Sequence, residues 1–261
     1  MSTGALLEPA LLEPWQALLL GLVEGLTEFL PVSSTGHLLL AQRALGLART
    51  PALDAFVVVV QLGAILAVLG LYRRRSLLLL RGLLGREPDG ARLLARLLLA
   101  FLPVAVLGLL AEAPIERHLF GLWPITVAWA VGGALLLLLP RRAPESGLGL
   151  EALGPRGALL IGLFQCAALI PGTSRSLATL LGGVVAGLSL AAAVEFSFLL
   201  GVLTLASAAG WKLLTKGSAM LSDLGGSALL LGSLAAALSA AASVAFLAAW
   251  VRRHGLGLFG W

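Results

Sequence analysis

The chain has 261 residues, of which 59% are hydrophobic and 12% are charged, with a formal net charge of +5. Its mean hydropathy of +1.00 excludes a soluble globular domain and predicts an all-α protein that crosses a membrane several times. A single cysteine, Cys166, excludes an intramolecular disulfide. Because the arginines cluster at the ends of apolar runs, the positive charge predicts membrane orientation and not binding to nucleic acid.

The first apolar run, residues 15–30, is too short and too acidic for a simple membrane span, since a crossing helix needs about 20 apolar residues. Pro31 interrupts it, a hydroxyl-rich turn follows at 33–37, and a second short apolar run covers 38–47. Together the two runs predict a re-entrant helix–turn–helix hairpin. An interrupted apolar segment that carries acids is costly in lipid, and it therefore indicates a functional site.

Five full spans are predicted after this hairpin, and they cover residues 53–72, 93–111, 119–139, 190–211 and 226–250. Between the third and the fourth span lies a second broken pair of apolar runs, 157–170 and 177–187. Its turn begins at Pro171 and contains several hydroxyl side chains. Each half of the chain therefore begins with a hairpin and continues with full spans.

The two hairpins also align in sequence, since Gly21-x-x-Glu24 of the first corresponds to Gly162-x-x-Gln165 of the second. Interrupted segments at corresponding positions of two halves are typical of internal repeats with a site at the membrane midplane. We therefore expect one integral membrane domain over residues 1–261, with repeat 1 at about 15–139 and repeat 2 at about 156–251.

Arginine placement predicts the topology. Six arginines lie within residues 73–92, which are expected to form a loop, and further pairs occur at 141–142 and 252–253, so these segments are expected on the cytoplasmic side. Repeat 1 contains three spans, which is an odd number, so repeat 2 would start on the opposite side of the membrane and be inverted relative to repeat 1. The first hairpin then enters from outside and the second from inside, and their tips can meet within the membrane. If the two repeats are symmetric, one more helix is expected after Gly260, so repeat 2 is expected to lack its last helix.

Glu24 and Glu28 are four residues apart, so both carboxylates are expected on one face of the first helix. Two carboxylates in a medium of low dielectric constant repel each other, and Mg²⁺ typically binds one or two carboxylates together with substrate phosphates. The pair is therefore predicted to hold a divalent cation, Mg²⁺ or Ca²⁺. The alternative is a protonated pair that ties helices together.

The turn after Pro31 contains Ser33, Ser34, Thr35 and His37. A serine nucleophile needs a nearby base, and His37 follows Ser34 by three residues. Ser34, His37 and Glu28 are therefore predicted to be catalytic, and Ser33 and Thr35 to bind substrate. The alternative is a turn that satisfies its own backbone groups and caps the following helix.

Arg175 lies in the hydroxyl-rich turn of the second hairpin, at the start of a short helix. A guanidinium binds phosphate through two parallel hydrogen bonds, and a helix N-terminus adds backbone donors. Arg175 is therefore predicted to be catalytic, since it would bind a diphosphate and neutralise the charge that develops during phosphoryl transfer. The alternative is an arginine that reaches the membrane interface. Further substrate-binding residues are predicted nearby, namely Gln165, Gly172, Thr173, Ser174, Ser176 and Thr179. Gln165 could equally join helices by a hydrogen bond, which is also the role expected for Gln61.

These stretches resemble the bacterial undecaprenyl-diphosphatase family, the membrane enzymes linked to bacitracin resistance. The resemblance rests on EGLTEFLPVSSTGH at 24–37, QLGAILAV at 61–68, PGTSRSLAT at 171–179 and EFSFLL at 195–200. Two departures stand out: Leu177 occupies a position where the family usually has glycine, and the family has one more membrane helix at its end.

The resemblance implies a multi-pass enzyme of the bacterial cytoplasmic (inner) membrane, with an active site that opens toward the outer face. It implies metal-dependent hydrolysis of undecaprenyl diphosphate to undecaprenyl phosphate, which recycles the lipid carrier for cell-wall synthesis. It also implies that Glu24, Glu28, Ser34, His37 and Arg175 occupy the functional positions of the family.

Several alternatives stay open at this point. Ser34 attacks with His37 as base or proton shuttle, or His37 attacks, or a metal-bound water does. A lipid flippase or anion-coupled transporter built on the same inverted repeat is the alternative function, and a phosphotransferase to another lipid is a third. The expected partners are the lipid substrate and the lipid bilayer, with no nucleic acid; a homodimer stays open.

Overall fold

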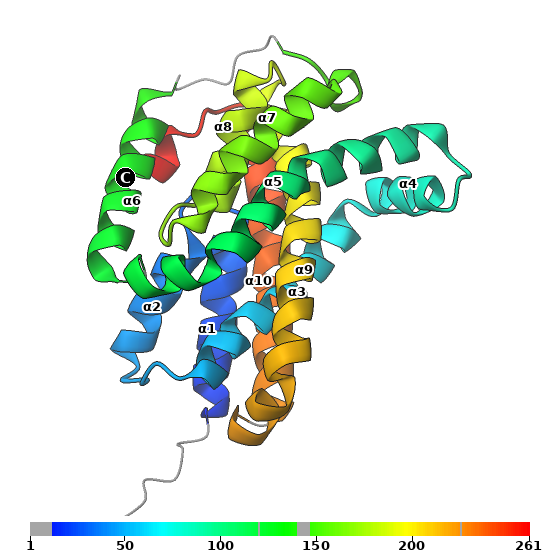
Figure 1. The fold of residues 1–261 in the computed structure, drawn as a ribbon. Helices are drawn as coiled ribbons and strands as arrows, with labels where there is room; N and C mark the ends of the chain where they lie inside the picture. Colours follow the sequence, from blue (N-terminus) through cyan, green and yellow to red (C-terminus); the bar gives the residue numbers. More distant parts are fainter. Residues whose placement is uncertain (1–11, 120, 140–146, 225) are drawn as a thin grey trace, which may run out of the picture.

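The computed structural model describes residues 12–119, 121–139, 147–224 and 226–261, and over these residues the fold is all-helical (Figure 1). The helices are α1 (Pro14–Thr27), α2 (Ser34–Ala44), α3 (Pro51–Leu71), α4 (Arg73–Leu83), α5 (Pro88–His118), α6 (Leu122–Leu138), α7 (Pro155–Gln165), α8 (Arg175–Val185), α9 (Leu190–Leu224) and α10 (Gly226–Trp250). Short 3₁₀ turns occur at η1 (Leu150–Ala152), η2 (Cys166–Leu169) and η3 (Gly257–Gly260).

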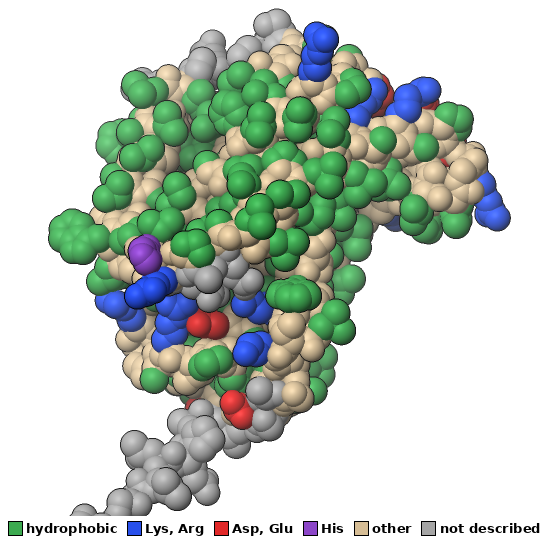
Figure 2. Space-filling model, viewed as in Figure 1, with side chains coloured by type: hydrophobic (Ala, Val, Ile, Leu, Met, Phe, Trp, Pro, Cys, Tyr) green, Lys and Arg blue, Asp and Glu red, His purple; other side chains and the backbone are tan. Residues whose placement is uncertain are grey.

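Four of the described helices are long and apolar enough to cross a membrane, and they are Pro51–Leu71, Pro88–Ala111, Leu190–Ser218 and Gly226–Trp250. Figure 2 shows hydrophobic side chains over much of the outer face of the molecule. Leu110 and Leu214, for example, are 77% and 86% exposed, which is costly in water and favourable against lipid chains. The protein is therefore a multi-pass membrane protein, as the composition predicts.

Both predicted hairpins are present. Helices α1 and α2 form the first, and α7, η2 and α8 form the second. Figure 1 shows the two hairpins approaching each other from opposite ends of the bundle, with their tips close together near its middle. The tips are joined directly, because the Ser176 hydroxyl donates to the carbonyl oxygen of Leu30 over 2.7 Å. The inverted relation between the two complete halves stays a prediction.

Small residues bring α10 close to the first hairpin. A Cβ atom at Gly21 or Gly25 would overlap the α10 backbone, at Gly232 and Ala236 respectively. The Ser243 hydroxyl donates to the carbonyl oxygen of Gly25 over 2.9 Å. Close backbone contact and interhelical hydroxyl bonds are the means by which helices associate in lipid. The position of α1, and so of the hairpin tip, is thus fixed by the last long helix.

The predicted cytoplasmic loop at 73–92 is wrong in its structure, because most of it is helical. It forms α4 and the first turn of α5, and these two helices touch where Gly82 lies against the backbone of Gly90. At the start of α4, Arg75 pairs with Glu195 over 2.5 Å and with Glu151 over 2.8 Å. The hydrogen bond from Arg75 holds the pKa of the exposed Glu151 carboxyl below its usual value.

The predicted span at 119–139 is also wrong in extent. Helix α5 continues to His118, so the chain reverses only before α6, which covers Leu122–Leu138. Its 17 residues give a length of about 26 Å, less than the ~30 Å of a bilayer core. This shorter helix lies beside the hairpin tips, where Leu177 of α8 approaches Gly132.

Candidate active site

The tip of the first hairpin brings Glu28 and Ser34 together. Helix α1 ends at Thr27, but Glu28 keeps helical backbone angles and donates its N–H to the carbonyl of Glu24 over 2.8 Å. Ser33 has a φ of 65°, which is uncommon for a residue with a side chain. This left-handed residue ends the turn and lets α2 begin at Ser34. The Ser34 hydroxyl then donates to Oε2 of Glu28 over 2.5 Å, with both side chains buried.

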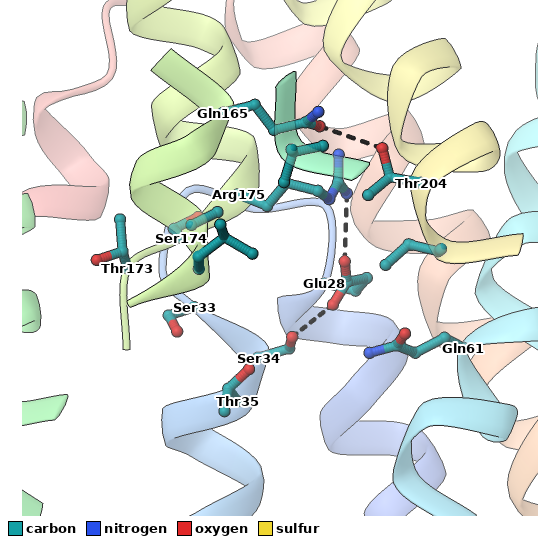
Figure 3. A pocket seen from close by; sticks show the side chains of 14 residues that line it. Glu28, Ser33, Ser34, Thr35, Gln61, Gln165, Thr173, Ser174, Arg175 and Thr204 are labelled. Carbon is teal, nitrogen blue, oxygen red and sulfur yellow. Dashed lines mark hydrogen bonds and ion pairs between the residues drawn. The ribbon is translucent and has the colours of Figure 1, made fainter. Parts of the chain in front are cut away.

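Arg175 reaches the same carboxylate from the second hairpin. Its Nη2 donates to Oε1 of Glu28 over 3.2 Å, and its Nη1 donates to the carbonyl of Ser197 on α9 over 3.2 Å. The guanidinium lies 5.5 Å from the ring centre of Phe29, which adds a cation–π contact. Figure 3 shows Arg175, Glu28 and Ser34 in a connected row. Residues 147 positions apart in the sequence thus share one site, as the hairpin argument predicts.

A cavity of about 190 Å³ surrounds this row. Eight of the residues that line it were predicted as site residues from the sequence, namely Glu28, Ser33, Ser34, Thr35, Gln165, Thr173, Ser174 and Arg175. Gln61 and Thr204 add two polar side chains, and Val104, Ala168, Leu169 and Leu205 add an apolar part. The cavity therefore combines hydroxyl, amide, carboxylate and guanidinium groups with an apolar wall, which suits an anionic headgroup joined to a lipid.

Three residues predicted to bind substrate lie outside this cavity and are used within the fold. Gly172 has a φ of 91° and lies against Ile125 of α6, so it shapes the second turn. Ser176 is fully buried in its bond to Leu30. The Thr179 hydroxyl lies 2.6 Å from that of Ser197. These side chains hold the second hairpin against its neighbours, and Arg175 is the member of the turn that projects its charge into the site.

His37 bonds the backbone beside Ser34 and not Ser34 itself in this structure, so its predicted role as base or proton shuttle stays a prediction. Its Nδ1 lies 2.8 Å from the carbonyl oxygen of Ser33, and its ring packs on Trp129 with ring centres 4.9 Å apart. The ring lines a second, largely apolar cavity of about 920 Å³ between the tips and α6, which shares Thr173 and Ser174 with the first cavity. Because Ser34 turns toward α1, the group that accepts its proton in this structure is Glu28.

Glu24 lies behind Glu28 and does not line the cavity. Both of its carboxylate oxygens are buried, and neither has a hydrogen-bond partner of good geometry, although the side chains of Glu28 and Gln61 lie close enough to interact with it. Among the described residues, no group of three or more His, Cys, Asp or Glu side chains could hold a metal ion alone. Two unpartnered carboxylate oxygens next to a second carboxylate do fit a cation that also binds substrate oxygens.

Comparison with known proteins shows which family the chain belongs to. The family model described as "Bacitracin resistance protein BacA" matches residues 17–261. The chain belongs to the BacA family. A relative from Sorangium cellulosum named undecaprenyl-diphosphatase is 46% identical over 252 residues, which are 95% of this chain and 82% of the relative. The undecaprenyl-diphosphatase 2 of Rhodospirillum rubrum is 44% identical, covering 94% and 89%. The undecaprenyl-diphosphatase of Cereibacter sphaeroides is 45% identical, covering 94% and 91%.

Two cavity residues of this BacA-family chain were not predicted from the sequence. Gln61 of α3 projects into the cavity (Figure 3), although its place in an apolar span suggested a bond between helices. Thr204 of α9 lines the cavity and contacts Gln165. A polar amide inside a span was the available signal for Gln61. The sequence contains no such signal for Thr204, since a lone threonine in a membrane helix usually forms a hydrogen bond with the backbone of its own helix.

Proposed function

We propose that this chain is an undecaprenyl-diphosphatase, which hydrolyses undecaprenyl diphosphate to undecaprenyl phosphate and inorganic phosphate. Relatives of that name are 44–46% identical over most of both chains. The observation that carries the proposal is the row of hydroxyl, carboxylate and guanidinium built by Ser34, Glu28 and Arg175. A nucleophile (Ser34), a base (Glu28) and a guanidinium that can bind phosphate (Arg175) therefore share one small cavity. Phosphoryl transfer requires these three kinds of group.

The hydrogen bond from Ser34 to Glu28 defines the first step. As the Ser34 oxygen bonds to the terminal phosphorus, its proton passes to Glu28 and the bond to the bridging oxygen breaks. The electron pair leaves on undecaprenyl phosphate. A water molecule then attacks the phosphoserine, the bond between the Ser34 oxygen and phosphorus breaks, and inorganic phosphate leaves. Glu28 returns its proton to the Ser34 oxygen, and the proton lost by the water leaves with the phosphate or to solvent. Arg175 binds the equatorial oxygens, whose negative charge is spread in the transition state.

We also propose that Glu24 and Glu28 hold a divalent cation when substrate is bound. The two unpartnered oxygens of Glu24 support this assignment. When bound, such an ion neutralises charge on the phosphate groups. The site is compatible with Mg²⁺ and with Ca²⁺, since both take carboxylate and phosphate oxygens.

The proposed location is the bacterial cytoplasmic membrane, with the cavity open toward the outer face. Arginine placement supports this orientation, because α4 and the chain end after α10 carry clustered arginines. Labelling of a cysteine placed at Arg81 should therefore require permeable cells; labelling on intact cells would contradict the orientation. A homodimer stays open.

Phosphate release by the purified protein in detergent tests the enzymatic function. The wild-type chain should release inorganic phosphate from undecaprenyl diphosphate, and the Ser34→Ala variant should not. A flippase or an anion-coupled transporter needs a sealed membrane, whereas hydrolysis does not. Lipid movement in vesicles without phosphate release in detergent would therefore contradict the proposal and favour the transporter.

A further inference from the structure

The cavity contains buried hydrogen-bond donors that the catalytic row does not use. Among the described residues, Nε2 of Gln165 and Nε of Arg175 are buried and have no hydrogen-bond partner. Both belong to residues that line the cavity, and the Gln165 side chain is completely buried. An unpaired buried donor destabilises the fold, because it has lost its hydrogen bonds to water without replacing them. Donors left unpaired beside a cavity therefore indicate an anionic ligand that supplies acceptors.

The structure places Oε1 of the Gln165 amide next to the hydroxyl of Thr204 on α9. This hydroxyl lies 3.2 Å from Oε1 of Gln165 and 2.9 Å from the carbonyl of Leu200. In this arrangement Nε2 is the end of the amide that has no hydrogen-bond partner. Figure 3 shows Gln165 above Arg175 and Glu28, and Ser34 below them. The cavity thus has a nucleophile end and an amide end.

The apolar wall lies at the amide end. Leu205 directly follows Thr204 on α9, and Ala168 and Leu169 lie one turn beyond Gln165 in η2. Leu169 packs toward α5, where a Cβ atom at Gly108 would lie 3.6 Å from its Cδ2. These three side chains, together with Val104 of α5, line the cavity between η2, α5 and α9. An isoprenoid chain would meet apolar contacts on this side.

We infer that Gln165, oriented by Thr204, binds the lipid-linked phosphate of the substrate, while the terminal phosphate lies at Ser34. The inference rests on the proposed function and sets the direction of the diphosphate within the site. The isoprenoid then leaves between η2, α5 and α9. Arg175, between the two ends, contacts oxygens of both phosphates. The group that departs after attack by Ser34 is then the lipid phosphate, held by the Gln165 amide.

Product inhibition separates the two ends of the cavity. Undecaprenyl phosphate and inorganic phosphate would each be titrated as inhibitors of the wild-type chain and of Gln165→Leu. Loss of a neutral donor to a charged oxygen should weaken inhibition by undecaprenyl phosphate about 10- to 100-fold. Inhibition by inorganic phosphate should change less than about twofold, because that product is bound at the Ser34 end. Thr204→Val should give a smaller change of the same kind.

Two further variants keep the test decisive. Gln165→Glu presents only acceptors and a negative charge, so it should bind undecaprenyl phosphate more weakly than Gln165→Leu. Gln42→Leu is the matched control, since Gln42 is a buried amide on α2 outside the cavity. It should leave both inhibition constants unchanged. If Gln165→Leu does not fold in detergent, Gln165→Asn, which shortens the amide, gives the same readout.

Three results would overturn the inference. Equal weakening of both products would make Gln165 a general structural support. Weakening of inorganic phosphate alone would reverse the direction of the substrate. Wild-type inhibition in Gln165→Glu would mean that the amide oxygen faces the ligand. Failure of the proposed function itself looks different, because the wild-type chain would then release no phosphate at all.

Discussion

Gly201 offers the sharpest test of how Arg175 is held, because it requires no change to a charged group. Gly201 lies on α9 directly against the guanidinium. A Cβ atom at this position would lie 2.5 Å from Nη1, 2.8 Å from Nη2 and 2.9 Å from Cζ of Arg175. The Gly201→Ala variant should therefore displace the guanidinium while the helix, which gains about 1 kcal/mol in intrinsic propensity, stays folded.

The size of the effect follows from these distances. Non-bonded atoms prefer about 3.5–4.0 Å, so the guanidinium must move by about 1 Å. The bond from Nη2 to Glu28 is already 3.2 Å long, near the upper limit of a good N–H···O bond, and such a shift breaks it. A hydrogen bond to a charged group contributes about 1.5–3 kcal/mol. The expected loss in kcat is therefore about 10- to 150-fold.

The assay is phosphate release in detergent, with thermal unfolding followed in parallel. Gly210→Ala is the matched control, since Gly210 lies on the same helix and a Cβ atom there meets nothing within 4 Å. It should keep wild-type turnover. Wild-type kcat in Gly201→Ala, with unchanged unfolding in both variants, would refute the argument that α9 positions Arg175.

Four further outcomes are expected from the same assay. Ser34→Ala should lose at least about 10³-fold in kcat, and Ser33→Ala much less, because only Ser34 bonds Glu28; equal losses would contradict this. Arg175→Lys should already lose about 10²-fold, since the planar fork is gone; near-normal turnover would count against phosphate binding. A chelator should abolish wild-type activity, and Glu24→Gln should raise the metal concentration needed for turnover. Full activity of Glu24→Gln at low metal concentration would reject the cation site. His37→Asn should exceed His37→Ala in activity, because the amide can replace Nδ1 in bonding Ser33; equally inactive variants would restore His37 as the base.

The backbone plan of the site could be predicted from the sequence because its signals are local. Pro31 and Pro171 interrupt apolar runs that are too short to cross, and this pattern predicts both hairpins. The meeting of their tips followed from arginine placement. The helical nature of 73–83 was missed, since clustered arginines indicate a side of the membrane and do not distinguish a loop from an amphipathic helix.

Side-chain partners could not be predicted in the same way. Ser34 and His37 are three residues apart, yet the ring bonds the Ser33 backbone and Ser34 turns to Glu28. The sequence contains both contacts as possibilities, and the turn geometry at Ser33 decides between them. The role of Gly201 depends on a guanidinium 26 positions earlier in the chain. Such contacts arise only when separate helices pack, so no local pattern carries them.

The central claim is that the two hairpins build one catalytic site through the contact between Glu28 and Arg175. A double-mutant cycle measures this directly, with kcat/KM for undecaprenyl diphosphate determined for Glu28→Gln, Arg175→Lys and the combined variant. If the two groups act as a unit, the double variant should be about as impaired as the worse single variant. Losses that multiply, as for independent residues, would contradict the shared site.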